Sequence, residues 1–157
     1  MGEREVPVTA AAGLSLRELL ELPVMLGDIR LGVSIDAVLD SESLRVVGLE
    51  VECGDGVRRF LPLAAARIGE DRVELGSALM LLEENVGAFY RRRSTSFAAL
   101  MGLAVERAGQ PLGRLVDLVI ARDGTTESVR VLVDGAGEQS HPRAGVVIGR
   151  ARRIPAA

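Results

Sequence analysis

Two short segments of the chain have the spacing of apolar residues that is typical of a helix. Ser15 is a candidate N-cap, and leucines follow it after one, four and five residues, on one face of a helix. Ser96 opens a second segment with the same spacing of apolar residues. The first segment ends before Pro23, and Gly102 closes the second. The pattern therefore predicts one short helix in each half of the chain.

Runs of β-branched or alternating apolar residues follow each predicted helix. They span residues 33–39 and 46–52 in the first half, and residues 115–120 and 129–133 in the second half. Asp-Gly pairs, which favour tight turns with positive φ, occur at Asp55-Gly56, Asp123-Gly124 and Asp134-Gly135. Short strands at this spacing, with no crossover helices between them, predict a small barrel or sandwich.

The two halves of the chain repeat one pattern. A shift of 81 positions brings Ser15 onto Ser96 and Asp36 onto Asp117. The further matches share residue type and need only small gaps: Leu31-Gly32 with Leu112-Gly113; Val47, Leu49 and Val51 with Val129, Val131 and Val133 after one inserted residue; Pro62 with Pro142; and Ile68-Gly69 with Ile148-Gly149. Apolar matches are expected by chance, but matches of Ser, Gly, Asp and Pro in the same register are not.

We interpret the chain as two copies of one unit, over residues 14–75 and 95–154, with a connector over residues 76–94. Within the connector, Ala78–Leu82 is an apolar run that fits either a last buried strand or the start of a helix. Residues 83–93 have acids first and arginines last, the order that suits the dipole of a helix.

Both copies carry the motif Leu-Gly-x-x-x-Asp-x-Val, which begins at Leu31 and at Leu112. The first copy continues with the Pro-containing run Phe60-Leu61-Pro62-Leu63. This pattern resembles the PRC-barrel family, which includes the cytoplasmic domain of the photosynthetic reaction-centre H subunit and the C-terminal domain of a bacterial ribosome-maturation factor. The second copy departs from the pattern after Gly135, because Ser140–Ala144 is more polar than its counterpart.

The resemblance implies a mainly β protein with two tandem small PRC-type β-barrels, each preceded by a short helix and joined by a short helical connector. It also implies a non-enzymatic protein-interaction or scaffold module of a bacterial cytoplasmic protein, which binds a protein partner or a membrane-associated complex. The alternative is a ribosome-associated assembly or maturation factor that contacts a ribosomal protein.

Four polar or small residues are repeated between the copies and are expected to have structural roles. Gly32 and Gly113 should occupy the same backbone place before the long strand, with positive φ or close backbone packing. Asp36 and Asp117 are candidate paired carboxylates. Because they recur in both copies, we expect them to accept hydrogen bonds from backbone or arginine at the strand entry.

The residue types that carry most catalytic and metal chemistry are scarce. The chain has one cysteine, Cys53, and one histidine, His141, which cannot form a ligand cluster for a metal. A single cysteine forms no intramolecular disulfide, which fits a reducing compartment, and Cys53 is expected to pack inward. His141 is expected to be an exposed loop residue. The chain has no lysine and therefore no phosphate loop with a following lysine. We expect no enzymatic activity and no cofactor.

The charges are distributed unevenly along the chain. Residues 1–90 carry 8 arginines and 16 acids, whereas residues 91–157 carry 11 arginines and 6 acids. The basic half is therefore a candidate binding surface for an acidic protein partner or for membrane headgroups. The candidate residues are Arg91, Arg92, Arg93, Arg143, Arg150, Arg152 and Arg153. The alternative interpretation is that these arginines pair with acids of the other copy.

Three further properties of the sequence limit the kinds of partner and the location that we expect. A net charge of −3 and only four aromatic residues, three Phe and one Tyr, argue against direct binding of nucleic acid. No apolar run reaches 18 residues, so no transmembrane helix is expected, although peripheral membrane association stays open. The acidic N-terminus has no apolar segment of a signal peptide, and we expect a cytoplasmic location. A homodimer also stays open.

Overall fold

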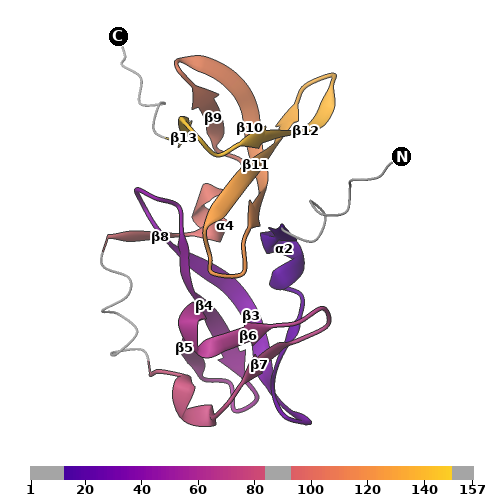
Figure 1. Cartoon of the computed structure of the whole chain (residues 1–157), viewed down its shortest axis with the longest axis vertical. Helices are drawn as coiled ribbons and strands as arrows, with labels where there is room; N and C mark the ends of the chain where they lie inside the picture. Colours follow the sequence, from indigo (N-terminus) through magenta and orange to yellow (C-terminus); the bar gives the residue numbers. More distant parts are fainter. Residues whose placement is uncertain (1–12, 84–92, 150–157) are drawn as a thin grey trace.

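The computed structural model describes residues 13–83 and 93–149, and shows a mainly β molecule built from two sheets (Figure 1). One sheet has the strand order β5-β4-β3-β2-β7-β6, and β8 pairs with β3 beside this path. Its strands are β2 (Pro23–Leu26), β3 (Ile29–Asp40), β4 (Val46–Cys53), β5 (Arg58–Pro62), β6 (Ala66–Ile68), β7 (Val73–Leu75) and β8 (Ser94–Ser96).

The other sheet has the strand order β12-β11-β10-β9-β13, and β1 pairs with β10. Its strands are β1 (Leu14–Ser15), β9 (Ala104–Arg107), β10 (Gln110–Ile120), β11 (Thr126–Val133), β12 (Gly137–Pro142) and β13 (Val146–Ile148). The helical segments are α2 (Leu16–Leu19), α4 (Phe97–Leu100) and the short 3-10 helices η1 (Leu63–Ala65) and η2 (Ala78–Met80). Both α-helices lie at the waist between the two halves (Figure 1).

Each half sends its first strand and helix to the other half. β1 begins the first half of the chain but pairs with β10, with Ser15 opposite Val119. β8 begins the second half but pairs with β3, with Ser96 opposite Val38. The two sheets are therefore linked by exchanged segments in a pseudo-two-fold arrangement. Each repeat's first segment pairs with the other half, so the sheets do not follow the boundaries of the sequence repeat. The domain boundaries derived from the repeat therefore stay predictions.

The repeat extends over the helix and four strands and differs at the last strand. β2, β3, β4 and β5 have the same neighbours as β9, β10, β11 and β12. In the first half β6 pairs with β7, and β7 runs parallel to β2. In the second half β13 pairs directly with β9 in antiparallel orientation. The last strands of the two halves are therefore not equivalent in pairing.

The structure also corrects the alignment of β4 with β11. Leu49 lies opposite Ala37, and Val129 lies opposite Leu118, which is the counterpart of Ala37. Leu49 therefore corresponds to Val129 and not to Val131. Relative to the first half, the second half has one residue fewer between these strands, whereas the sequence alignment had placed one residue more. The predicted match was wrong by two residues, because a slip of two keeps every apolar side chain on the same face of a strand.

The apolar core is continuous through both halves. One buried cluster includes Leu39 and Leu49 of the first sheet together with Leu115 and Leu118 of the second, all 0% exposed. Cys53 is a free, buried cysteine in this core, which confirms that it packs inward. Because neither half closes its own core, we expect the halves to support each other's packing.

The connector has a mixed structure where it is described. η2 covers Ala78–Met80, and Leu82 then forms an isolated antiparallel bridge with Phe60 of β5. The apolar run is thus neither a regular strand nor the first turn of an α-helix. The helix predicted over residues 83–93 lies, apart from its two end residues, outside the described residues. Within the described part of the chain, no helix has the length and apolar character needed to cross a membrane.

Candidate functional site

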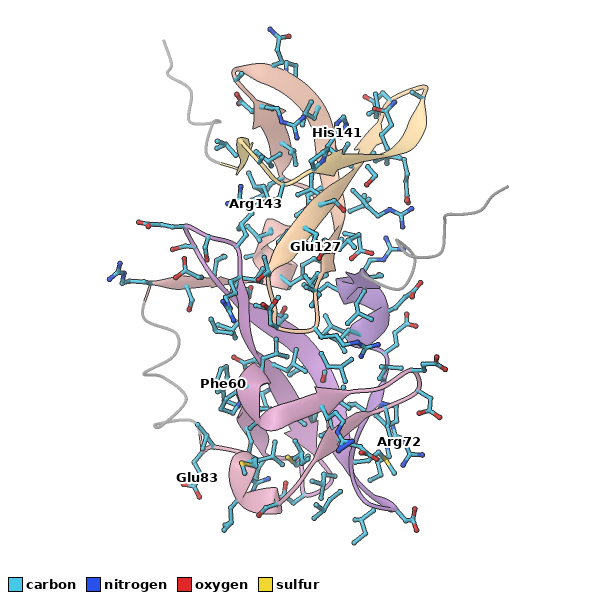
Figure 2. All side chains as sticks on the ribbon, viewed as in Figure 1. Phe60, Arg72, Glu83, Glu127, His141 and Arg143 are labelled. Atoms are coloured by element: carbon cyan, nitrogen blue, oxygen red, sulfur yellow. The ribbon has the colours of Figure 1, made fainter. Side chains whose placement is uncertain are left out.

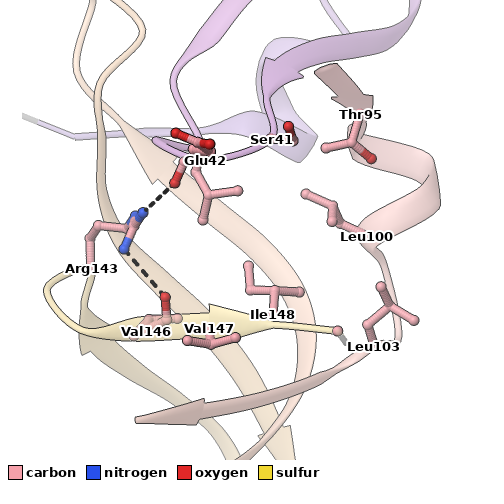
Figure 3. A pocket seen from close by; sticks show the side chains of 11 residues that line it. Ser41, Glu42, Thr95, Leu100, Leu103, Arg143, Val146, Val147 and Ile148 are labelled. Carbon is pink, nitrogen blue, oxygen red and sulfur yellow. Dashed lines mark hydrogen bonds between the residues drawn. The ribbon is translucent and has the colours of Figure 1, made fainter. Parts of the chain in front are cut away.

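A cavity of about 420 Å³ lies where the two halves meet, between the turn after β3, the α4 segment and β13 (Figure 3). Its walls are mostly aliphatic side chains, namely Leu44, Leu100, Leu103, Val146, Val147 and Ile148. Leu103 is 38% exposed and Val147 is 54% exposed, so both present apolar surface to solvent. The polar lining comes from Ser41, Glu42, Thr95 and Arg143. We call this cavity the junction groove.

The turn that forms one wall of the junction groove is held by the Asp40 carboxylate. Asp40 Oδ1 accepts hydrogen bonds from the backbone N–H groups of Ser43 (2.9 Å) and Glu42 (2.8 Å). These bonds hold the pKa of Asp40 below its ordinary value of 3.8, because they stabilise the charged form. Leu44 then adopts a φ of 61°, in the left-handed region, and buries its side chain in the core. The conformation costs about 1–2 kcal/mol, and burial of the side chain offsets it.

Arg143 joins the second half to this turn of the first half. Its Nη2 donates to the backbone oxygens of Glu42 (3.2 Å) and Ser43 (3.4 Å), and its Nη1 donates to the oxygen of Val146 (3.3 Å) (Figure 3). Its Nε is buried and has no hydrogen-bond partner in the described parts of the chain. All three acceptors are neutral carbonyls, so within residues 13–83 and 93–149 the guanidinium forms no ion pair with a carboxylate.

A second cavity, of about 600 Å³, lies at the pseudo-equivalent junction of the two halves. Leu19, Leu22, Ile68 and Gly69 take the places there that Leu100, Leu103, Ile148 and Gly149 take in the junction groove. The charges differ, because Glu18, Glu21 and Glu70 line this twin groove, together with Arg122. Arg122 Nη1 donates to the backbone oxygen of Ile68. The two grooves thus share a framework and differ in electrostatic character.

The structure describes two of the seven arginines predicted to bind a partner. Arg143 lines the junction groove, and the backbone oxygen of Arg93 accepts hydrogen bonds from Ser41 N (3.1 Å) and Ser41 Oγ (2.8 Å). Both arginines therefore border the turn after β3. The other five predicted residues lie outside the described residues: Arg91, Arg92, Arg150, Arg152 and Arg153.

The repeated aspartates hold the exchanged helices. Asp117 is 3% exposed, and its carboxylate accepts hydrogen bonds from Ser15 Oγ and from the backbone N–H of Arg17 (3.0 Å). Asp36 is half-buried and accepts a hydrogen bond from the backbone N–H of Ala98 (3.0 Å), the counterpart of Arg17. Each aspartate thus bonds the first turn of the helix that comes from the other half.

The repeated glycines lie inside the long strands and not before them. A Cβ added at Gly32 would lie 2.3 Å from the backbone oxygen of Glu52, and one at Gly113 would lie 2.7 Å from that of Leu132. Gly113 has a φ of 140°, whereas Gly32 has no positive φ. Close backbone approach is therefore common to both positions, and the left-handed backbone belongs to Gly113 alone.

The predicted place of His141 was wrong. His141 lies in β12 opposite Val129, is half-buried, and its Nε2 has no hydrogen-bond partner in the portions of the chain that the structure describes (Figure 2). It occupies the position that Leu61 occupies in β5. Among residues 13–83 and 93–149, no group of three or more His, Cys, Asp or Glu is placed to hold a metal ion.

Sequence reasoning missed the apolar part of the junction groove. Leu103 and Val147 stand in ordinary alternating patterns, and Leu44 belongs to a turn that the sequence pattern did not single out. The groove forms only where segments from both halves lie together, and no local sequence pattern predicts that contact.

Comparison with known proteins found no protein-family model and no curated protein that matches the chain. The resemblance to the PRC-barrel family therefore depends on the motifs quoted above.

Proposed function

We propose that the chain is a tandem PRC-barrel-type module that holds a protein partner in the bacterial cytoplasm and has no enzymatic activity of its own. The repeated motif in β3 and β10 supports this proposal, as does the strand order that the two halves share over four strands. In this proposal each curled sheet, together with the strand and helix it receives from the other half, is one barrel-like unit.

The observation that carries the proposal is the junction groove. Binding sites are usually concave and mostly apolar, and Leu103 and Val147 line this cavity while they stay partly exposed to solvent. Arg143 lies in the same groove, which favours a partner with acidic groups. The excess of arginine over acids in residues 91–157 acts in the same direction.

The polar groups of the groove support binding better than catalysis. Ser41 Oγ donates to the backbone oxygen of Arg93, and no histidine lines the groove to activate this hydroxyl or that of Thr95. Glu42 lines the groove beside an arginine whose bonds go to backbone carbonyls. These residues do not form the nucleophile and base pair that acyl or phosphoryl transfer requires.

The test is affinity capture from a bacterial extract with the intact chain, followed by mass spectrometry. We expect one protein or one assembly to be enriched, and its association rate to fall as salt screens the arginines. Enrichment of ribosomal proteins would favour the alternative of a ribosome-associated maturation factor. Membrane-associated or other cytoplasmic assemblies would favour the scaffold function. Capture of no specific protein under any salt condition would contradict the proposal.

A further inference from the structure

We propose that the junction groove binds an extended protein segment that presents a leucine-sized aliphatic side chain next to a carboxylate. This inference rests on the proposed function and names the chemistry of the partner. The aliphatic group would enter the groove between Leu103 and Val147, and the carboxylate would lie against Arg143.

The apolar part of the groove is suited to one aliphatic side chain. The whole groove, polar part included, has a volume of about 420 Å³, in the range of about 300–1,000 Å³ that is usual for ligand pockets. Leu44, Leu100 and Val146 in its walls are buried, so the floor of the groove is apolar. Leu103 and Val147 would lose exposed apolar surface when the groove is filled, which stabilises the bound state.

The charge of Arg143 selects the group beside the aliphatic side chain. A guanidinium has five N–H donors, and the bonds of Arg143 to three neutral carbonyls are long, at 3.2–3.4 Å. A carboxylate at the groove mouth would accept a charge-assisted hydrogen bond from Nη1, which is stronger than the bonds already present. An amide carbonyl in the ligand would accept only a weaker hydrogen bond from this cation, and a second arginine would be repelled by it.

The twin groove provides an internal comparison. It has equivalent leucine and isoleucine walls, but three carboxylates and one arginine line it, namely Glu18, Glu21, Glu70 and Arg122. The junction groove has one carboxylate, Glu42, beside Arg143. The three carboxylates of the twin groove would repel an acidic segment, so the same ligand should distinguish the two grooves. The duplication has thus produced one groove that accepts a carboxylate and one that rejects it.

The experiment titrates the isotope-labelled full chain with two small probes and follows backbone amide shifts by NMR. Acetyl-leucine has the aliphatic side chain and a carboxylate, whereas acetyl-leucinamide has the same side chain without the charge. We expect acetyl-leucine to shift the amides of Ser41, Leu103 and Val147, and to leave those of Leu22 and Glu70 in the twin groove unchanged. The amide probe should bind at least about threefold more weakly, because a partly exposed ion pair contributes about this much to affinity.

Two variants and one control test whether the probes bind in the junction groove. Arg143→Gln should make the two probes bind equally, and Val147→Asp should abolish the binding of both. Leu132→Asp is the matched control, because Leu132 is 45% exposed on β11 and does not line the groove. If Arg143→Gln weakens the fold, Val147→Asp still tests the site, since its side chain is more than half exposed.

Failure of this inference is distinguishable from failure of the proposed function. Equal affinity of the two probes, shifts confined to the twin groove, or no shifts at high probe concentration would overturn the inference. So would a partner whose capture survives Val147→Asp, although that outcome leaves the proposed function intact. Shifts in the junction groove without any captured protein would overturn the proposed function alone.

Discussion

At the scale of single residues, Asp36 and Asp117 show how a repeated position can have a role between the halves. Their recurrence predicted a structural role, and the hydrogen bonds to backbone are of the predicted kind. The sequence did not indicate which helix each aspartate bonds. Ser15 and Ser96 begin matching segments, so the helix of either copy satisfies the local pattern equally well. The choice is made by the packing of the two halves.

Removal of these carboxylates should destabilise the fold unequally. Asp117→Ala leaves Ser15 Oγ and the N–H of Arg17 without their acceptor in a buried site, and we expect a loss of about 2–3 kcal/mol in the free energy of unfolding. Asp36→Ala should cost less, because Asp36 is half-buried and water replaces part of its bonding. Chemical denaturation of both variants measures the difference. Equal losses, or no loss for Asp117→Ala, would contradict the assigned contacts.

Gly32 and Gly113 should resist substitution because the neighbouring strand lies too close for a side chain. Gly32→Ala and Gly113→Ala each force backbone atoms apart, and we expect about 1–3 kcal/mol of destabilisation. Gly54→Ala is the control, because a Cβ at Gly54 meets nothing within 4 Å. Thermal unfolding compares the three. A melting temperature for Gly32→Ala equal to that of Gly54→Ala would show that the strands separate without cost.

Asp40 should make the stability of the fold depend on pH in the acid range. Its pKa is lowered in the folded state by the N–H groups of Ser43 and Glu42, so the unfolded chain binds the proton first as pH falls. Its contribution is complete above the unfolded pKa and is lost as pH decreases from about 4 through the lower folded pKa. Asp40→Asn keeps an acceptor oxygen but does not titrate.

We therefore expect the stabilities of Asp40→Asn and the natural chain to differ at neutral pH and to converge in acid. Urea unfolding at a series of pH values measures this convergence. A constant difference across the series would mean that the turn is not held by the charged form of Asp40.

At the scale of elements, the sequence predicted the helix and the two longest strands of each half but not their exact register. Regular alternation in 46–52 and 129–133 permits slips of two residues, because side chains then keep their faces. The last strand was harder to predict, since Val146–Ile148 and Ala66–Ile68 are each three residues long and pair differently. Strands this short are placed by tertiary packing and not by their own pattern.

β5 and β12 are equivalent strands with different outer edges. Phe60 of β5 donates to and accepts from Leu82, both at 2.8 Å, whereas no strand pairs with the outer edge of β12 in the described portion of the chain. Ser140 occupies the place of Phe60 in the shared register, so its N–H points away from β11.

Hydrogen exchange should therefore separate these two positions. We expect the amide of Phe60 to exchange slowly and that of Ser140 to exchange rapidly. The amides of Leu61 and His141, which face the neighbouring strand in both halves, should both be protected. Strong protection at Ser140 would show that another part of the chain, or a second copy, covers this edge.

At the scale of the whole molecule, the exchange of β1–α2 and β8–α4 makes the two halves one unit. Leu16 and Leu19 of α2 are buried, and the helix they belong to is bonded to Asp117 of the other half. The repeat in the sequence predicted two similar units but not their interdependence, because a duplicated chain has the same pattern whether its segments are exchanged or not. The junction groove is a consequence of this exchange, since α4 and β13 meet the first half there.

The claim that each half receives its helix from the other half is tested most directly by native-state hydrogen exchange in the variant Leu19→Ala. Leu19 belongs to the first half in sequence and, in this structure, to a helix bonded to the second sheet. We predict that the cavity, which costs about 2–5 kcal/mol, lowers the protection of Val131 in β11 as much as that of Val51 in β4. Loss of protection at Val51 with Val131 unchanged would mean that each half keeps its own helix, and would contradict the account.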